Sequence, residues 1–180
     1  FRTGRLAGHV FDVASRTRIL RYLYGFYRKM IAPTDFLYDA YANNDFYPDR
    51  LIKINFGIDL KSVSDFSRAK VKNGDRPVRF GYIGQIAYHK GIDILLKAYA
   101  RVRGNKKSLV IYGPFDQVPD YMESLRELSD GLENVEFRGT FPKEELGRRL
   151  SELDFLVIPS RWYENSPLVL LYSLAVKTPV

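Results

Sequence analysis

The sequence predicts an α/β fold, namely a Rossmann-like parallel sheet with helices on both faces, preceded by a fragment of a second α/β domain. From residue 78 onward, short apolar runs alternate with helical segments of about ten residues, which is the pattern of βαβ units. The part before it is more aromatic and basic, and a polar stretch separates the two. We therefore expect the C-terminal part of one domain over 1–58, a linker over 59–77 and a second domain over 78–180, truncated before its sheet is complete.

Composition excludes several classes of protein. The 180 residues include no cysteine and two histidines, which excludes a disulfide framework and thiol chemistry and disfavours a zinc site. No apolar run approaches the ~20 residues that span a bilayer. A net charge of +7 favours an anionic partner, such as nucleic acid, acidic lipid or a diphosphate, although a merely soluble basic surface is an equal alternative. The lack of cysteine weakly favours a cytoplasmic location.

The N-terminal part is expected to contain two helices and two strands. Thr17–Met30 reads as an aromatic and basic helix, which either lies on an anionic membrane or packs on a sheet with its arginines in water; the second arrangement is the commoner one. A short strand follows at Ile31–Pro33, and Thr34 is a suitable N-cap for a helix over Asp35–Asn43. Leu51–Phe56 reads as the second strand.

The second domain is expected to contain four strand and helix pairs. The strands are predicted at Val78–Ile83, Ser108–Tyr112, Val135–Phe137 and Asp154–Ile158, and the helices at Gly91–Val102, Pro119–Leu132, Lys143–Leu153 and Ser166–Val176. Apolar stripes at helical spacing mark the core faces of the first two helices: Ile92, Leu95, Leu96 and Tyr99, and Tyr121, Leu125, Leu128 and Leu132.

The loops after these strands should meet at one edge of the sheet, because parallel strands have their carboxyl ends together and ligands bind there. In the first loop, Gly84 lets the backbone approach a ligand, and Lys90 can place a cation on a phosphate. The second contains Gly113. The third, with Arg138, Gly139, Thr140 and Phe141, can hold a planar base. For Gly113 and Gly139 taken singly, ordinary turn formation is an equally good reading.

The fourth loop precedes the last helix and contains Glu164. A carboxylate there either caps the helix or binds sugar hydroxyls. His89 is either an acid or base or, more commonly, a solvent-facing loop residue, and Trp162 and Tyr163 either stack on a substrate or plug the end of the sheet. Because Gly-x-Gly-x-x-Gly and Walker motifs are absent, a dinucleotide oxidoreductase and a P-loop NTPase are disfavoured. The lack of Asp-x-Asp favours a site without metal.

Four stretches together resemble a known family: Arg79–Tyr99, Asp154–Leu171, Ile31–Leu37 and Ile54–Asp59. They are similar to four parts of the retaining glycosyltransferases of the GT-B fold, group 1 or family 4. In the order given, these parts are the opening of the donor domain, its signature strand with the loop and helix that follow, the end of the acceptor domain, and the hinge. The resemblance extends from about Tyr27 to Val180, and the signature stretch is its most specific part.

The resemblance implies transfer of a sugar, of hexosyl type, from a nucleoside diphosphate sugar to a glycan, lipid-linked or polysaccharide acceptor with retention. It implies no cofactor and no nucleic-acid partner, and a cytoplasmic protein for which peripheral association with the inner membrane face is an option. The chain would hold the end of the acceptor domain and most of the donor domain, and would be inactive alone.

The resemblance also assigns roles to residues of the donor site. Glu164 would orient the sugar, while Lys90 and Gln85 would meet the diphosphate. The backbone of the helix start would assist them, and it comprises Asn165, Ser166, Pro167 and Leu168. Two positions depart from the family pattern: Gln85 replaces an arginine, and Tyr172 replaces a second glutamate that contacts the ribose. A non-catalytic nucleotide-sugar-binding or partner-binding module of the same fold is therefore the alternative.

Overall fold

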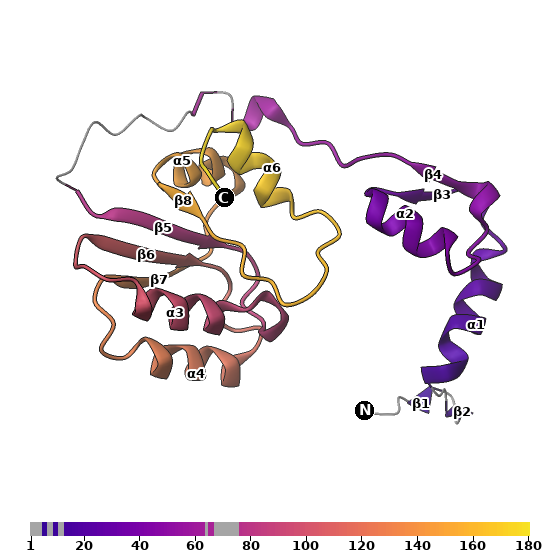
Figure 1. Cartoon of the computed structure of the whole chain (residues 1–180), viewed down its shortest axis with the longest axis horizontal. Coiled ribbons are helices and arrows are strands. Elements are labelled where there is room, and N and C mark those ends of the chain that lie inside the picture. Colours follow the sequence, from indigo (N-terminus) through magenta and orange to yellow (C-terminus); the bar gives the residue numbers. More distant parts are fainter. Residues whose placement is uncertain (1–4, 7–8, 11–12, 64, 67–75) are drawn as a thin grey trace. The chain divides into compact units, whose positions relative to one another are not determined.

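The computed structural model describes residues 5–6, 9–10, 13–63, 65–66 and 76–180. These fall into two units, which we call unit 1 (Phe1–Phe56) and unit 2 (Gly57–Val180) (Figure 1). Within the described residues, every helix is too short or too polar to span a bilayer.

Unit 1 is built around two short parallel strands. Its elements are β1 (Arg5–Leu6) and β2 (His9–Val10), which pair antiparallel, α1 (Val13–Tyr24), β3 (Met30–Ala32), α2 (Asp35–Ala42), a 3-10 turn at Pro48–Arg50 and β4 (Leu51–Lys53), which pairs parallel with β3. The hydroxyl of Thr34 accepts from the N–H of Leu37 at 3.2 Å, so the predicted N-cap of α2 is confirmed. The strand expected over Leu51–Phe56 ends at Lys53, and the last backbone bond to β3 runs from the N–H of Ile54 to the carbonyl of Ala32 at 3.2 Å.

The aromatic helix of unit 1 ends earlier than the sequence predicted. It was expected over Thr17–Met30 and lies at Val13–Tyr24. Gly25 follows its last residue, and a side chain at Gly25 would lie 2.6 Å from the hydroxyl of Tyr47. Glycine is a poor helix former and here leaves room for that ring, so the chain turns out of the helix.

Unit 2 confirms the predicted α/β fold with a parallel sheet. Its strands are β5 (Val78–Ile83), β6 (Lys107–Tyr112), β7 (Val135–Gly139) and β8 (Phe155–Leu156), all parallel, in the order β7-β6-β5-β8. Its helices are α3 (Ile92–Arg101), α4 (Pro119–Ser129), α5 (Leu146–Ser151) and α6 (Leu168–Ala175), with 3-10 turns η2 (Leu60–Ser62), η3 (Tyr88–Lys90) and η4 (Lys143–Glu145).

Two apolar clusters lie on opposite faces of this sheet. One joins alternate residues of β5 and β6 to α3 and α4, and the other joins the remaining alternate residues to α5 and α6 (Figure 1). The predicted α3 stripe is confirmed, since its four members are at most 6% exposed. On α4, Leu125 of the predicted stripe is buried together with Met122, Tyr121 and Leu132 pack partly buried against the same cluster, and Leu128 is 38% exposed.

The last strand and helix are shorter than expected. The strand expected over Asp154–Ile158 pairs with β5 only at β8, although backbone bonds to β5 continue one residue on each side. The helix expected from Ser166 begins at Leu168, after Pro167. Proline disfavours the helical conformation in the residue before it, so the loop that carries Glu164 extends to this point.

Part of the stretch expected as a linker over 59–77 packs within unit 2. Val63 is 3% exposed and belongs to the cluster under α5 and α6. Phe66 lies so close to Gly147 that a side chain there would meet its ring at 2.5 Å. Residues 64 and 67–75 of the expected linker lie outside the described residues.

Candidate functional site

The loops after β5, β6 and β7 are joined at the carboxyl edge of the sheet. The N–H of Gly84 donates to the carbonyl of Tyr112 at 3.0 Å, and the N–H of Gly113 donates to that of Gly139 at 2.9 Å. A side chain on Gly113 would lie 2.2 Å from the carbonyl oxygen of Gly84. Gly113 is therefore required for the close approach of two loops, and a role of Gly113 towards a ligand stays a prediction.

A small pocket of about 200 Å³ opens between these three loops. It is lined by Ile83, Gly84, Tyr112, Gly113, Pro114, Gly139, Thr140 and Phe141. The ring of Phe141 meets that of Tyr112 edge to face, with centroids 5.1 Å apart. Five of the predicted donor-binding residues thus share one pocket: Gly84, Gly113, Gly139, Thr140 and Phe141. The aromatic wall suits a flat ligand.

The two residues predicted as catalytic lie in contact at the same edge. Nζ of Lys90 donates to Oε1 of Glu164 at 2.6 Å, and the hydroxyl of Ser160 donates to the same oxygen at 2.6 Å. Both side chains of the ion pair are about one-fifth exposed. Lys90 follows β5 and Glu164 follows β8, which are neighbours in the sheet, so residues 74 positions apart in the sequence meet. The pair forms a polar centre beside the loops that line the pocket.

The protonation of Glu164 is controlled by these contacts. Burial alone would raise the pKa of the Glu164 carboxyl, but hydrogen bonds from Lys90, Ser160 and the Trp162 side chain outweigh burial and lower that pKa. The carboxylate is therefore ionised throughout the physiological range and acts as a hydrogen-bond acceptor.

We expect the Glu164 contacts to make the stability of unit 2 depend on pH in acid. Because the folded-state pKa is lowered, the stabilisation is complete above the ordinary glutamate pKa of about 4.3 and is lost as the pH falls through the folded-state pKa. Urea midpoints measured from pH 7 to pH 3 should fall less steeply in Glu164→Gln than in the wild type. Glu144 is an exposed carboxylate on η4, and Glu144→Gln should leave the dependence of the urea midpoint on pH unchanged. Equal dependence in the wild type and both variants would contradict this account.

An aromatic ring, that of Trp162, lies next to this ion pair. Trp162 and Tyr163 are 53% and 83% exposed, so the alternative that they plug the end of the sheet is wrong. The Trp162 ring lies 4.3 Å from the His89 ring and 5.3 Å from Nζ of Lys90. His89 is half-buried against this ring, which supports neither an acid or base role nor free solvent exposure.

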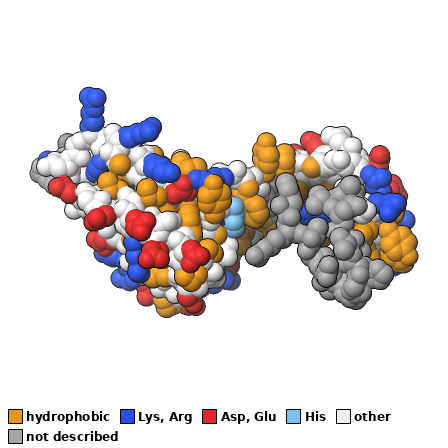
Figure 2. Space-filling view, turned by 90° about the horizontal axis from the view of Figure 1, so that it is seen from below, with side chains coloured by type: hydrophobic (Ala, Val, Ile, Leu, Met, Phe, Trp, Pro, Cys, Tyr) orange, Lys and Arg blue, Asp and Glu red, His pale blue; other side chains and the backbone are white. Residues whose placement is uncertain are grey.

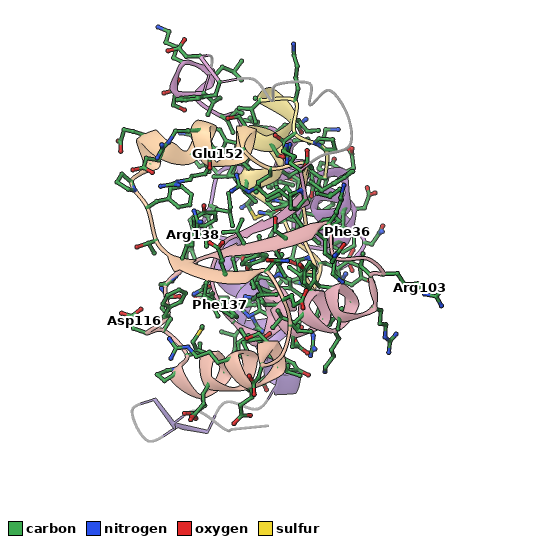
Figure 3. All side chains as sticks on the ribbon, turned by 90° about the vertical axis from the view of Figure 1, so that its left-hand side faces the viewer. Phe36, Arg103, Asp116, Phe137, Arg138 and Glu152 are labelled. Atoms are coloured by element: carbon green, nitrogen blue, oxygen red, sulfur yellow. The ribbon has the colours of Figure 1, made fainter. Side chains whose placement is uncertain are left out.

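Arg138 is not brought to the pocket that the rest of its loop lines. Figure 3 shows Arg138 and Phe137, neighbours on β7, pointing to opposite faces of the sheet, with Arg138 on the side of Glu152. Its guanidinium pairs with Glu136 on the same strand. Alternation along a strand explains the difference, because Phe137 packs into the α3 and α4 cluster.

Arg138 instead lines a groove of about 550 Å³ on the face of the sheet beside α5. Its walls are Arg76, Pro77, Arg79, Ser108, Leu109, Val110, Tyr112, Glu136, Arg138, Ser151, Glu152 and Leu153. The charges are of both signs, and Arg76 is already held by the buried carboxylate of Asp154 at 2.8 Å. The groove contains none of the glycine loops, so we place the candidate site at the smaller pocket.

The remaining predicted residues lie at or near the edge without joining the ion pair. The side-chain amide of Gln85 donates to Gln117 at 2.8 Å. Tyr172 is 8% exposed and belongs to the apolar cluster under α5 and α6, so its ring is part of the core. Asn165, Ser166, Pro167 and Leu168 form the exposed or half-buried approach to α6. The roles of these residues towards a ligand remain predictions.

Sequence reasoning missed the residues that hold the fourth loop in place. Ser160 reaches Glu164, and the guanidinium of Arg161 pairs with the buried carboxylate of Asp93 on α3. Asp93 stands in the first turn of α3, where an acidic residue is ordinary helix chemistry, so it carried no signal. Ser160, four residues before Glu164, was the one available hint in the sequence.

A comparison with protein families shows which family the chain belongs to. The model of the family described as Glycosyl transferases group 1 matches residues 77–180, more than half of the chain. The chain belongs to this glycosyltransferase family. An uncharacterized glycosyltransferase of Methanocaldococcus jannaschii is 36% identical over 101 residues, which cover 55% of this chain and 25% of that protein.

Solved structures of other proteins have the same fold as this glycosyltransferase chain. HepE from Anabaena, in complex with UDP and glucose, has a TM-score of 0.78 at 19% identity, covering 93% of this chain and 48% of that one. Sucrose-phosphate synthase from Thermosynechococcus elongatus has a TM-score of 0.74 at 22% identity, covering 92% and 43%. These neighbours are GT-B glycosyltransferases, so the predicted fold is confirmed. The chain spans about a quarter of the curated relative's length and less than half of either structure.

Proposed function

We propose that this chain is the donor-binding part of a glycosyltransferase that transfers a hexose from a nucleoside diphosphate sugar to a glycan, lipid-linked or polysaccharide acceptor with retention. The observation that carries the proposal is the Lys90–Glu164 pair beside the glycine-lined pocket at one sheet edge. Family membership supports it. So do the HepE structures that contain UDP or UDP-glucose.

The strand order suggests how a donor would lie. The pocket belongs to the loops after β7, β6 and β5, whereas Glu164 follows β8 at the other end of this row. A base in the pocket would place the diphosphate near Gly84 and Lys90, and the sugar near Glu164. Lys90 would then stabilise the leaving diphosphate as a positioned cation, and Glu164 would orient the sugar hydroxyls.

The test is calorimetric titration of UDP, GDP and their sugars into a protein that carries both complete domains. We expect binding, and tighter binding of one nucleotide sugar than of its free nucleotide. A protein that is folded but binds none of them at millimolar concentration would overturn the proposal.

A non-catalytic module of the same fold is the second candidate, and the burial of Tyr172 favours it. The side chain fills the core where the family pattern has a glutamate towards the ribose. Tyr172→Glu discriminates the two. If the chain is a module that lost its ribose contact, Tyr172→Glu should bind the donor more tightly than the wild type. The wild type should then show neither sugar transfer nor donor hydrolysis. If the ring is needed in the core, Tyr172→Glu instead loses stability, because a buried carboxylate is costly.

We propose that donor binding is independent of metal ions, because the sequence lacks an Asp-x-Asp pair and Lys90 supplies a cation at this edge of the sheet. Excess EDTA should therefore leave the dissociation constant of the nucleotide sugar unchanged within about twofold, well under 1 kcal/mol. Lys90→Ala is the positive control and should weaken binding with or without EDTA. A large loss of affinity in EDTA, restored by Mg²⁺ or Mn²⁺, would contradict this.

We further propose that unit 1 approaches an anionic membrane, at the cytoplasmic face. Tyr22 and Phe26 are 68% and 72% exposed and meet edge to face with centroids 5.2 Å apart, next to Arg18, Arg28 and Lys29. Aromatic and basic side chains together suit a headgroup layer. Vesicles with acidic lipid should cosediment the protein at low salt and release it at high salt. Cosedimentation that does not depend on salt or acidic lipid would contradict this proposal.

A further inference from the structure

Arg161 fastens the loop that carries Glu164 to the turn that carries Lys90. Its guanidinium pairs with the carboxylate of Asp93, in the first turn of α3, and its central carbon lies 4.0 Å from the centroid of the Tyr88 ring on η3. The N–H of Arg161 donates to the carbonyl of His89 at 2.9 Å. One residue therefore makes three contacts with the segment on either side of Lys90.

The partner of Arg161 is itself rigidly held. Asp93 is 6% exposed, and its carboxylate accepts from the hydroxyl of Tyr121 at 2.8 Å. Burial alone would raise the pKa of Asp93, but the Tyr121 hydrogen bond and the charges of Arg161 and Lys97 lower it. Lys97 is a weaker partner, at 3.6 Å and with a side chain 60% exposed. Tyr121 extends the connection to α4.

We propose that the Arg161–Asp93 pair positions Glu164 for the donor sugar. Arg161 stands directly after Ser160, whose hydroxyl donates to Oε1 of Glu164 at 2.6 Å, and directly before Trp162, whose ring lies 5.3 Å from Nζ of Lys90. The inference that the ligand is a donor sugar rests on the proposed function. Arg161 is a positioning residue, since it acts through its neighbours and does not contact Glu164 among the interactions of the described residues.

A role in packing alone does not explain this choice of residues. The side chain of Arg161 is 25% exposed and that of Asp93 is 9% exposed, and an ion pair with a buried partner gains little stability over apolar residues because the buried charge loses its hydration. The planar guanidinium of Arg161 pairs with the Asp93 carboxylate while it lies over the Tyr88 ring, and the compact ammonium of a lysine would do this with fewer donors and without a flat face. The arrangement therefore serves the geometry of the loop.

The chain contains one tryptophan, Trp162, which lies next to Arg161 and reports on this loop without any ligand. In Arg161→Ala, Trp162 fluorescence should be quenched more strongly by acrylamide and should have lower anisotropy than in the wild type. Arg161→Lys should show smaller changes in the same direction. It provides the test if the alanine variant does not fold. Lys97→Ala, which removes the other cation beside Asp93, should match the wild type. Fluorescence in both Arg161 variants identical to the wild type would overturn the proposal.

Donor binding to the full natural protein then tests the connection to Glu164 through a double-mutant cycle. Arg161→Ala should lower the affinity for the nucleotide sugar by about tenfold, since small misplacements of a contact residue are expensive. The same change made in Glu164→Gln should have little further effect. Additive losses would show that Arg161 acts independently of Glu164 and would contradict the proposal. If the wild type binds no nucleotide sugar, the proposed function fails, whereas the fluorescence result still decides whether Arg161 holds the loop.

Discussion

Glu164→Gln should lower the affinity of the full natural protein for its nucleotide sugar by about 1.5–3 kcal/mol, the contribution of a hydrogen bond to a charged group. The substitution keeps the size of the side chain but removes the charge that attracts Lys90 and Ser160. The affinity for the free nucleotide should change less, because Glu164 lies beyond the pocket that is proposed for the base. Calorimetry with a nucleotide sugar and with its nucleotide measures both effects.

Glu144→Gln provides the matched control for this prediction. Glu144 is an exposed carboxylate on η4, outside the loops at the carboxyl edge. The control should bind both ligands like the wild type. If Glu164→Gln also binds both ligands like the wild type, Glu164 does not contact the sugar, and the proposed roles of the edge residues fail together.

Gly91→Ala should destabilise unit 2 more than a glycine substitution usually does. Gly91 has φ +70, and a side chain there would lie 2.1 Å from the carbonyl oxygen of Pro159. The left-handed conformation alone costs alanine about 1–2 kcal/mol. Displacing Pro159 should cost about 1–3 kcal/mol more, because a backbone atom cannot move aside as a flexible side chain does. Urea denaturation followed by Trp162 fluorescence reports on this unit.

Gly131→Ala separates the two costs. Gly131 has φ +75, and a side chain there would have no other atom within 4 Å, so the substitution carries the conformational cost without the collision. The urea midpoint of Gly131→Ala should lie between the midpoints of the wild type and Gly91→Ala. Because Pro159 begins the loop that leads to Glu164, Gly91→Ala should also weaken donor binding, whereas Gly131→Ala should not. Equal loss of stability in the two variants would show that the approach of Gly91 to Pro159 is unimportant.

The sequence predicts the regular elements of unit 2 well because their local patterns agree with their burial. β5 lies at the expected residues, and α3 buries the expected stripe. Errors occur where one residue interrupts a pattern. Gly25 ends α1 before its aromatic stretch is complete, and Pro167 delays the start of α6.

The candidate site was predicted in part, since strand order decides which loops meet. Five residues of the predicted set share the pocket, and Lys90 meets Glu164. The side chain of Arg138 points to the opposite face of the sheet from that of Phe137, because neighbouring side chains on a strand alternate between faces. Its direction could therefore have been predicted once Phe137 was placed in the core. In contrast, the pairing of Arg161 with Asp93 joins residues 68 positions apart and has no local signature.

The charge of the chain is less informative than its net value suggests. Figure 2 shows Asp and Glu side chains interspersed with Lys and Arg over the visible face of unit 2, so this face has no continuous basic surface. Within the candidate site, Lys90 is held by Glu164 and Arg161 by Asp93. Under the proposed function, a diphosphate would therefore compete with Glu164 for Lys90.

A structure of the protein with bound UDP tests the central claim most directly. The account predicts the base in the pocket beside Phe141 and Gly113, the diphosphate within hydrogen-bond distance of Nζ of Lys90, and a longer distance between Lys90 and Glu164 than the 2.6 Å of the free chain. A nucleotide bound in the groove beside Arg79 and Arg138, with the Lys90–Glu164 pair unchanged, would contradict it.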